Sequence, residues 1–309
     1  MKEILVSGMI NVETSVFVRQ FPIEYAPIDF QFNGIDASVS GVGYNVAKAL
    51  KTLGAEPRLC SLIGNSDMYG DIIESEVNAL DIQTDAILKQ INNTPCSVVM
   101  FDSEGKRKII LDLKDIQENL YPEEIFVRVL KPCDIAVLCN INFSRGLLRI
   151  AKDQGKLIAT DVHVVSSIED DFNRDFMAAA DILFLSNEYI QGRESAFLRE
   201  LGKAFGCAII VVGMGERGAL LYSRSDDKQV LYSSVRVREI QSTVGAGDAL
   251  FSAFLYFYNK DKNPYTAMEN AIVFASYKIG EKGGGRGFLT ERALLEIKEN
   301  TPVEKTVYN

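Results

Sequence analysis

The stretch Ser242-Thr243-Val244-Gly245-Ala246-Gly247-Asp248 leads directly into an apolar run, residues 249–258, with the composition of a buried helix. Glycine and alanine at a helix start leave backbone N–H groups free, and the helix dipole favours an anion there. A carboxylate in this turn would repel a phosphate, so Asp248 suits a base that orients or deprotonates a hydroxyl attacking phosphorus. The free amides would belong to Gly245, Ala246 and Gly247. The alternative is a plain glycine-rich turn capped by Asp248.

The composition is that of a globular chain long enough for one large domain or two small ones. Of the 309 residues 47% are apolar, the formal net charge at pH 7 is -9, and the pI is about 4.9. This acidic balance argues against nucleic acid or an anionic membrane as a partner. No apolar run approaches the roughly 20 residues that span a bilayer. Because residues 1–8 read as a strand and not as a signal peptide, we expect a cytoplasmic protein.

Short apolar runs alternate with amphipathic helical patterns, which predicts an α/β fold with a mostly parallel sheet covered on both faces. Strands are expected at residues 4–7, 58–63, 135–139, 157–160, 182–185 and 208–212. Helices are expected at residues 46–53, 71–80, 125–130, 146–152 and 196–205. Two segments, about 12–38 and 96–114, lack a helical period and read as β excursions, the second with a hairpin turn at 102–105. No linker divides the chain, so residues 1–309 are predicted to form a single domain.

Three motifs resemble, in the same order, those of the PfkB (ribokinase-like) carbohydrate and nucleoside kinases. Residues 242–254 (STVGAGDALFSAF) are similar to D-T-x-G-A-G-D-x-F, residues 40–47 (SGVGYNVA) to G-G-x-G-x-N-x-A, and residues 64–70 (GNSDMYG) to G-x-D-x-x-G. The resemblance implies a three-layer α/β/α sandwich with a small β-sheet lid, often also the contact of a homodimer. It implies an ATP-dependent transfer of phosphate, with Mg²⁺, to a hydroxymethyl group of a sugar or nucleoside, of ribokinase, fructokinase or nucleoside/pseudouridine kinase type.

Small polar residues at strand ends and at a helix start suit a polyol, which needs several fixed donors and acceptors. The substrate-side candidates are Asn11, Glu13, Gly41, Gly43 and Asn45, with Asn140 added for its place after the strand at 135–139. The kinases that the chain resembles usually have N-x-D where this chain has Asn11-Val12-Glu13, so a pocket of altered shape is expected. A helix cap for Asn45 and tight turns for the glycines remain open.

A literal G-x-G-x-x-G follows the strand expected at 208–212. The dinucleotide fingerprint needs a helix next, whereas residues 219–232 read as a hairpin, so NAD binding is not expected. In the kinases that the chain resembles, a T-x-G-x-x-G segment at this place lines the ATP phosphates. The nucleotide-side candidates are therefore Gly213, Gly215, Gly218, Asn187, Thr243 and Gly284, the last within the glycine-rich run 283–287.

Three positions depart from the pattern of the kinases that the chain resembles. Asn187 and Glu188 are the metal candidates by resemblance to N-x-x-E, which helps hold magnesium, but Ile190 stands at its fourth position. Ser242 replaces an Asp that helps create a monovalent-cation site, which makes activation by such a cation doubtful. Gly213 stands where Thr is usual. These departures leave open a catalytically impaired sugar- or nucleoside-binding protein of the same fold as the alternative to a kinase.

Overall fold

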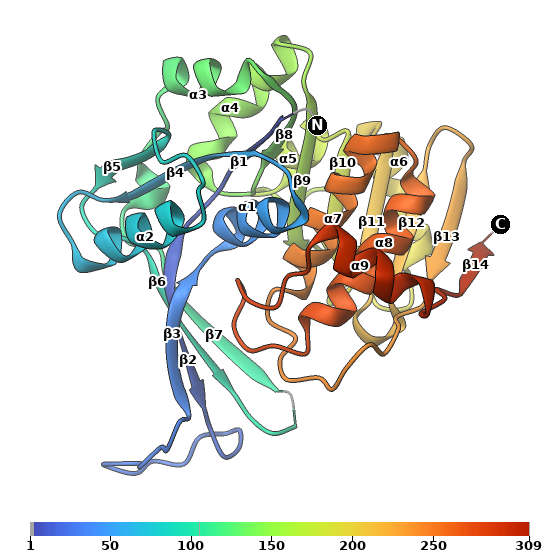
Figure 1. Ribbon diagram of the computed structural model, residues 1–309. Coiled ribbons are helices and arrows are strands. Elements are labelled where there is room, and N and C mark those ends of the chain that lie inside the picture. Colours follow the sequence, from blue (N-terminus) through green and yellow to red (C-terminus); the bar gives the residue numbers. More distant parts are fainter. Residues whose placement is uncertain (1–2, 105, 309) are drawn as a thin grey trace.

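A computed structural model describes residues 3–104 and 106–308, so Met1, Lys2, Asn309 and Gly105 of the predicted hairpin turn lie outside the described part. Within it, ten strands form one sheet in the order β14-β13-β12-β11-β10-β9-β8-β1-β4-β5 (Figure 1). Neighbours from β5 to β11 are parallel, and β12, β13 and β14 extend the sheet antiparallel. The strands are β1 (Glu3–Ser7), β4 (Pro57–Gly64), β5 (Ile87–Ile91), β8 (Cys133–Leu138), β9 (Leu157–Val164), β10 (Ile182–Ser186), β11 (Ile209–Gly213), β12 (Ala219–Ser223), β13 (Lys228–Tyr232) and β14 (Lys305–Tyr308).

Helices cover both faces of this sheet, which confirms the predicted three layers (Figure 1). Alternation along β1 shows why: Ile4 and Val6 enter one apolar core, and Leu5 enters the other. The first core is shared with α1 (Val42–Leu53), α7 (Ala246–Asp261), α8 (Pro264–Lys278) and α9 (Glu291–Glu299), and α2 (Met68–Ala79) lies beside α1. The second is shared with α3 (Glu123–Leu130), α4 (Asn142–Asp153), α5 (Arg174–Ala179) and α6 (Glu194–Phe205). Within the described ranges, no helix is both long and apolar enough to cross a bilayer.

Helix α7 is buried on nearly every side, as its apolar sequence predicts. Phe184 of β10 packs against it, with ring centroids 4.9 Å from Phe251 and 5.3 Å from Phe254. The helix begins after Gly245, whose φ of 76° lies in the left-handed region, and ends at Lys262 in the same region. This packing fixes the N-terminus of α7 at the carboxyl edge of the parallel strands.

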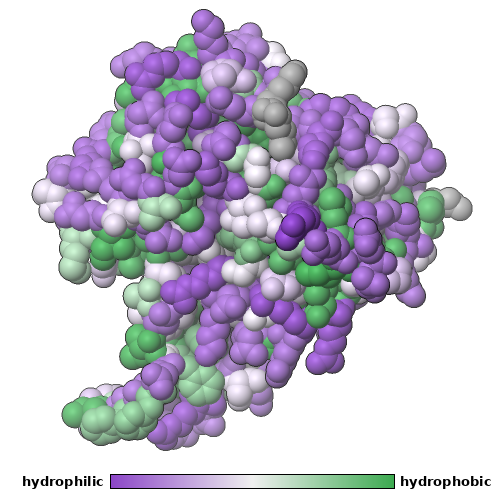
Figure 2. All heavy atoms as spheres, viewed as in Figure 1, coloured by the Kyte–Doolittle hydropathy of each residue, from purple (hydrophilic) through white to green (hydrophobic). Residues whose placement is uncertain are grey.

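A small separate sheet projects from the body (Figure 1). Its strands come from the two predicted β excursions and run in the order β3 (Ile35–Ser40), β2 (Asn11–Phe17), β6 (Cys96–Phe101) and β7 (Arg107–Asp112). This sheet, together with the segment that joins β2 to β3, is called the arm. Figure 2 shows apolar residues gathered on it. The exposed apolar side chains are Ile23, Tyr25, Ile28, Phe30, Phe32, Ile35, Val98, Ile109, Ile110 and Leu111. The arm therefore carries an apolar surface far larger than scattered single residues would make.

Candidate active site

The turn that the sequence singled out, residues 242–248, is termed here the anion-hole turn. No side chain of the described residues caps the N-terminus of α7. The amide of Ala246 donates to the carbonyl of Thr243 at 3.3 Å, whereas the amides of Gly245 and Gly247 have no partner within the described ranges. These two amides and the helix dipole together favour an anion at this point.

Asp248 lies in the first turn of α7 and is half-buried. Its Oδ2 accepts a hydrogen bond of 2.7 Å from Nδ2 of Asn45, which leaves Oδ1 for a ligand. Burial, followed by the like charge of Asp161, raises the pKa of Asp248, while Asn45 and the positive field of His163 and Lys278 oppose the rise. A carboxylate with a raised pKa beside an anion site is equipped to take a proton.

Close backbone packing joins the turn to residues 283–287, which we call the glycine loop. A Cβ on Gly245 would lie 2.5 Å from the carbonyl oxygen of Gly284. A Cβ on Gly284 would lie 2.8 Å from both Nδ2 of Asn45 and Oγ of Ser40. The glycines therefore allow the anion-hole turn, the glycine loop and the start of α1 to meet.

The N-terminus of α1 is held against the loop after β1 in the same way. Gly41 has a φ of 102°, and a Cβ there would lie 2.6 Å from the carbonyl oxygen of Met9. A Cβ on Gly43 would lie 2.5 Å from the carbonyl carbon of Gly8, and the Gly43 amide donates to Met9 at 3.0 Å. This contact directs Asn45, in the first turn of α1, toward Asp248.

Buried acceptors without partners lie next to this pair. Oε2 of Glu13 accepts from Ser40, whose Oγ is 3.5 Å from Nδ2 of Asn45, so a chain of polar contacts runs from Glu13 to Asp248. Oε1 of Glu13 and Oδ1 of Asn45 are buried and make no hydrogen bond to the described residues. Asn11 lies beside the start of α1, since a Cβ on Gly41 would be 3.0 Å from its Oδ1, and its Nδ2 donates to Ser97 at 2.8 Å. Two unpaired buried acceptors are costly unless a ligand brings donors to them.

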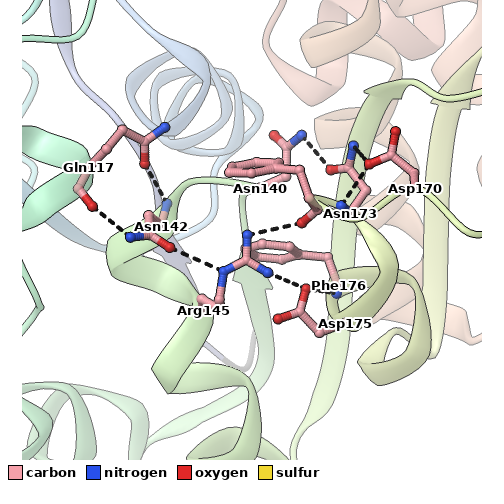
Figure 3. Close-up of polar contacts among 9 residues, drawn as sticks. Gln117, Asn140, Asn142, Arg145, Asp170, Asn173, Asp175 and Phe176 are labelled. Atoms are coloured by element: carbon pink, nitrogen blue, oxygen red, sulfur yellow. Dashed lines mark hydrogen bonds and ion pairs between the residues drawn. The ribbon is translucent and has the colours of Figure 1, made fainter.

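Asn140 stands apart from this group. Figure 3 shows its side chain directed toward Asn173, to whose Oδ1 it donates at 3.0 Å. Nearby, Arg145 lies over the rings of Phe172 and Phe176, with its guanidinium carbon 4.8 Å from each centroid. Within the described residues this network orders the segments after β8 and β9, and it does not link Asn140 to the group around Asn45.

The nucleotide-side candidates Asn187 and Gly213 meet at the ends of β10 and β11, where the Asn187 amide donates to the Gly213 carbonyl at 3.0 Å. Asn187 Nδ2 also donates to Glu194 at 3.0 Å, and Arg217 pairs with the same carboxylate. The pKa of Glu194 is lowered by these hydrogen bonds and by the charge of Arg217, against the opposing effect of burial. Glu188, the predicted metal candidate, is exposed, and Ile190 is buried in the core. The carboxylate beside Asn187 is thus that of Glu194.

The donor set around Asn187 suits a magnesium ion that is bound mainly through water and phosphate oxygens. Among the described residues, no cluster of three or more acidic, cysteine or histidine side chains could enclose a metal. Mg²⁺ usually keeps several waters and is bound through one or two carboxylates plus phosphate oxygens. Asn187 and Glu194 suit that mode.

The G-x-G-x-x-G segment leads into strands and not into a helix, as predicted. Gly215–Arg217 form one 3-10 turn, and β12 and β13 follow as an antiparallel hairpin. Gly218 is needed for packing, since a Cβ there would lie 1.9 Å from the Tyr232 carbonyl oxygen. No atom lies within 4 Å of a Cβ built on Gly215, so this backbone is open to a ligand.

The projecting sheet contacts the site at two points. Arg107 of β7 donates to Oγ1 of Thr243 at 2.9 Å, which places a guanidinium at the anion-hole turn. Arg286 of the glycine loop forms a 2.6 Å ion pair with Asp36 of β3. The sheet is therefore held over the turn, in the position of a lid.

Four further residues lie near the candidate site, and sequence reasoning gave none of them a functional role. Asp161 is buried in the C-terminal half of β9, and its Oδ2 lies 3.9 Å from the position of a Cβ on Gly247. His163 has a φ of 58° and donates its amide to Asp161 at 2.8 Å, a strained conformation of the kind that collects at functional sites. Glu194 and Lys278 come from helices that carry no motif. The only signal in the sequence was His163, the single histidine, in the run 160–163, and a lone histidine is more often structural than catalytic.

Comparison with known proteins agrees with this geometry. The sequence pattern of the pfkB family of carbohydrate kinases matches residues 1–291. A deoxyribokinase from Salmonella typhi is 25% identical over 301 residues, covering 91% of this chain and 94% of that protein. An ATP-dependent ribose-1-phosphate kinase from Halopiger xanaduensis is 22% identical over 286 residues, covering 92% and 94%.

Among solved structures, a microbiome-derived acarbose kinase superposes with a TM-score of 0.86 at 24% identity. The match covers 96% of this chain and 99% of that one, so the two share one ribokinase-like fold. The family match spans the anion-hole turn, the α1 start and the β10–β11 edge alike. The chain therefore belongs to the pfkB family of carbohydrate kinases.

Proposed function

We propose that this protein is an ATP-dependent kinase that phosphorylates a hydroxymethyl group of a sugar or nucleoside. The observation that carries the proposal is the pairing of Asp248 with Asn45 at the start of a buried helix, beside two amides that have no partner among the described residues. A base and an anion site within one helical turn are what transfer of a phosphoryl group to an alcohol requires.

The residues divide the work as follows. Asp248 accepts the proton of the attacking hydroxyl at Oδ1, while Asn45 holds Oδ2 and so fixes the carboxylate. The amides of Gly245 and Gly247 stabilise charge that develops on the transferred group. The arm that carries Arg107 excludes water, which would otherwise compete as acceptor.

On the acceptor side, a polyol satisfies what the protein leaves unpaired. Its hydroxyls donate to Oε1 of Glu13 and Oδ1 of Asn45, two buried acceptors that have no partner among the described residues. On the donor side, we assign Asn187, Gly213 and Gly215 to the ATP phosphates. Thr243 and Gly284 lie at the anion-hole turn and so belong beside the phosphoryl group that is transferred. Magnesium, held by Asn187 and Glu194 through water, would neutralise the phosphate oxygens.

The test is ATP-coupled ADP release against ribose, deoxyribose, fructose, other hexoses, adenosine, inosine and pseudouridine. We expect turnover with at least one, abolished by EDTA and restored by Mg²⁺. The impaired, ligand-binding alternative predicts thermal stabilisation by a sugar or nucleoside with no ADP release across the panel. Two observations speak against this alternative. The Glu194 carboxylate lies beside Asn187, where Ile190 supplies no acid, and Lys278 brings a positive charge to the carbonyl of Val244, near Ser242.

Replacing Glu13 by Gln tests the acceptor side. A hydrogen bond to a charged group contributes about 1.5–3 kcal/mol, so we expect KM for the acceptor to rise about 10-fold or more while KM for ATP stays constant. Glu56→Gln, at an exposed carboxylate paired with Lys51, is the matched control. Equal changes in both KM values would place Glu13 outside the acceptor pocket.

We also propose that the apolar arm surface packs against a second copy of the chain. Tyr25 is 94% exposed and Phe32 87% exposed, and both lie in the part of the arm between β2 and β3. Light scattering should show a dimer for the wild type and a monomer for the double variant Tyr25→Ser, Phe32→Ser. Tyr189→Ser, at an exposed tyrosine of the body, should leave the dimer intact. A wild type that is monomeric at micromolar concentration would rule this contact out.

A further inference from the structure

Lys278 is a fully buried lysine at the C-terminal end of α8. Its Nζ donates to the carbonyl of Val244 and, at 2.7 Å, to the carbonyl of Gly283. Its two hydrogen bonds both go to main-chain carbonyls, and it forms no ion pair with a carboxylate of the described residues. A buried ammonium without an ion pair is costly, so its retention needs an explanation.

The two carbonyls belong to the two loops that form the anion site. Val244 precedes Gly245 in the anion-hole turn, and Gly283 precedes Gly284 in the glycine loop. These loops meet where a Cβ on Gly245 would lie 2.5 Å from the Gly284 oxygen. Lys278 thus joins them by the same kind of contact, carbonyl oxygen to a single positive charge, that a bound monovalent cation would make.

A free monovalent cation does not fit here. The carbonyls of Val244 and Gly283 already accept from Nζ. Ser242, where the kinases that the chain resembles have an Asp, brings no charge, and its Oγ accepts from the Val244 amide at 3.3 Å. A second cation between these oxygens would be repelled by the ammonium.

We propose that Lys278 is an internal replacement for a monovalent cation: its ammonium ties the anion-hole turn to the glycine loop, so that phosphoryl transfer needs no added K⁺ or Na⁺. The inference rests on the proposed kinase function. Lys278 is a positioning residue, because it acts through the backbone of Val244 and Gly283 and touches neither substrate.

The role of the Lys278 charge can be tested by measuring kcat as a function of pH. Burial lowers the pKa of Lys278 to about 8, against the attraction of Asp248, Glu13 and Glu281 and with the repulsion of Arg238. The ammonium is therefore present below pH 8 and lost above it. We expect kcat to fall as pH rises through about 8 in the wild type, because carboxylates and guanidinium groups do not ordinarily titrate there.

The experiment compares the wild type with Lys278→Met in K⁺, NH₄⁺, Na⁺ and tetramethylammonium salts of equal ionic strength. Wild-type kcat should agree within about twofold in all four, and its Tm should not respond to K⁺. Lys278→Met should lose about 10²-fold in kcat with little change in KM, recover part of it with NH₄⁺ or K⁺, and lose the decline near pH 8.

Lys156→Met is the matched control, because Nζ of Lys156 also donates to two main-chain carbonyls, those of Lys131 and Cys133, far from the site. Lys156→Met should lower the Tm, and its kcat should depend on the added cation no more than that of the wild type. K⁺ activation of the wild type above tenfold, a wild-type Tm raised by about 2 °C or more by K⁺ over Na⁺, or Tl⁺ anomalous density between Val244 and Gly283 would overturn the proposal. The Tm and Tl⁺ measurements need no turnover and no folded variant, so they decide the inference even if no substrate is phosphorylated.

Discussion

Asp248→Asn should bind ATP as the wild type does and turn over about 10²–10⁴-fold more slowly, the usual contribution of a positioned base. The amide keeps the shape of the carboxylate and can still accept from Nδ2 of Asn45 through its oxygen, so the helix start stays in place. It cannot take the proton of the attacking hydroxyl. Steady-state kinetics should therefore show kcat lowered and KM for ATP unchanged.

A matched control lies at the other end of the same helix. Asp261→Asn changes an exposed carboxylate that accepts from the amide of Asn263, and it should leave kcat unaltered. Turnover of Asp248→Asn near the wild-type value, in a protein with wild-type Tm, would remove Asp248 from the role of base.

The expected pH dependence of kcat follows from the direction in which the pKa of Asp248 is shifted. Burial and Asp161 raise the pKa of Asp248 above the ordinary value of 3.8. Because the base acts only when ionised, kcat should fall as pH drops through that raised pKa, and the Asn variant should lack this fall. Together with the decline expected near pH 8 from Lys278, the wild-type profile should be bell-shaped.

The sequence predicted the parts of this fold that local patterns encode. The six expected strands each match an observed strand to within a few residues, because strands buried on both faces read as continuous apolar runs. Helix α1 begins at Val42, before the predicted start at residue 46. The prediction was late because Gly43 is a poor helix former, whereas its place in the helix is set by its contact with Gly8. Such a contact between distant segments leaves no periodic signal.

Contacts between distant segments also decide which residues of the candidate site could be predicted from the sequence. Asp248, Asn45 and Glu13 were found because each stands in or near a motif, and the structure brings them into one chain of contacts. Lys278 was missed because it looks like any basic residue in the last turn of a helix, where cations are common. Its distinctive feature is that the packing of α8 brings its ammonium to the carbonyls of both loops, and this contact exists only in the folded chain.

The anion-hole turn itself can be tested by adding one methyl group. Gly245 has a φ of 76°, and a Cβ there would lie 2.5 Å from the Gly284 oxygen. Gly245→Ala must therefore push the turn from the glycine loop and displace the amides of Gly245 and Gly247. Loss of one donor to a developing oxyanion costs about 10²–10³ in kcat, and we expect a fall of at least that size.

Gly192→Ala separates the clash from the backbone strain. Gly192 has a similar φ of 82°, but no atom lies within 4 Å of a Cβ built there. Both variants share the left-handed cost of about 1–2 kcal/mol in the free energy of unfolding, which a denaturant titration measures. Only Gly245→Ala should lose turnover, because only there does the methyl group meet the glycine loop. If both variants kept wild-type kcat, transition-state charge would have to be held elsewhere than at the start of α7.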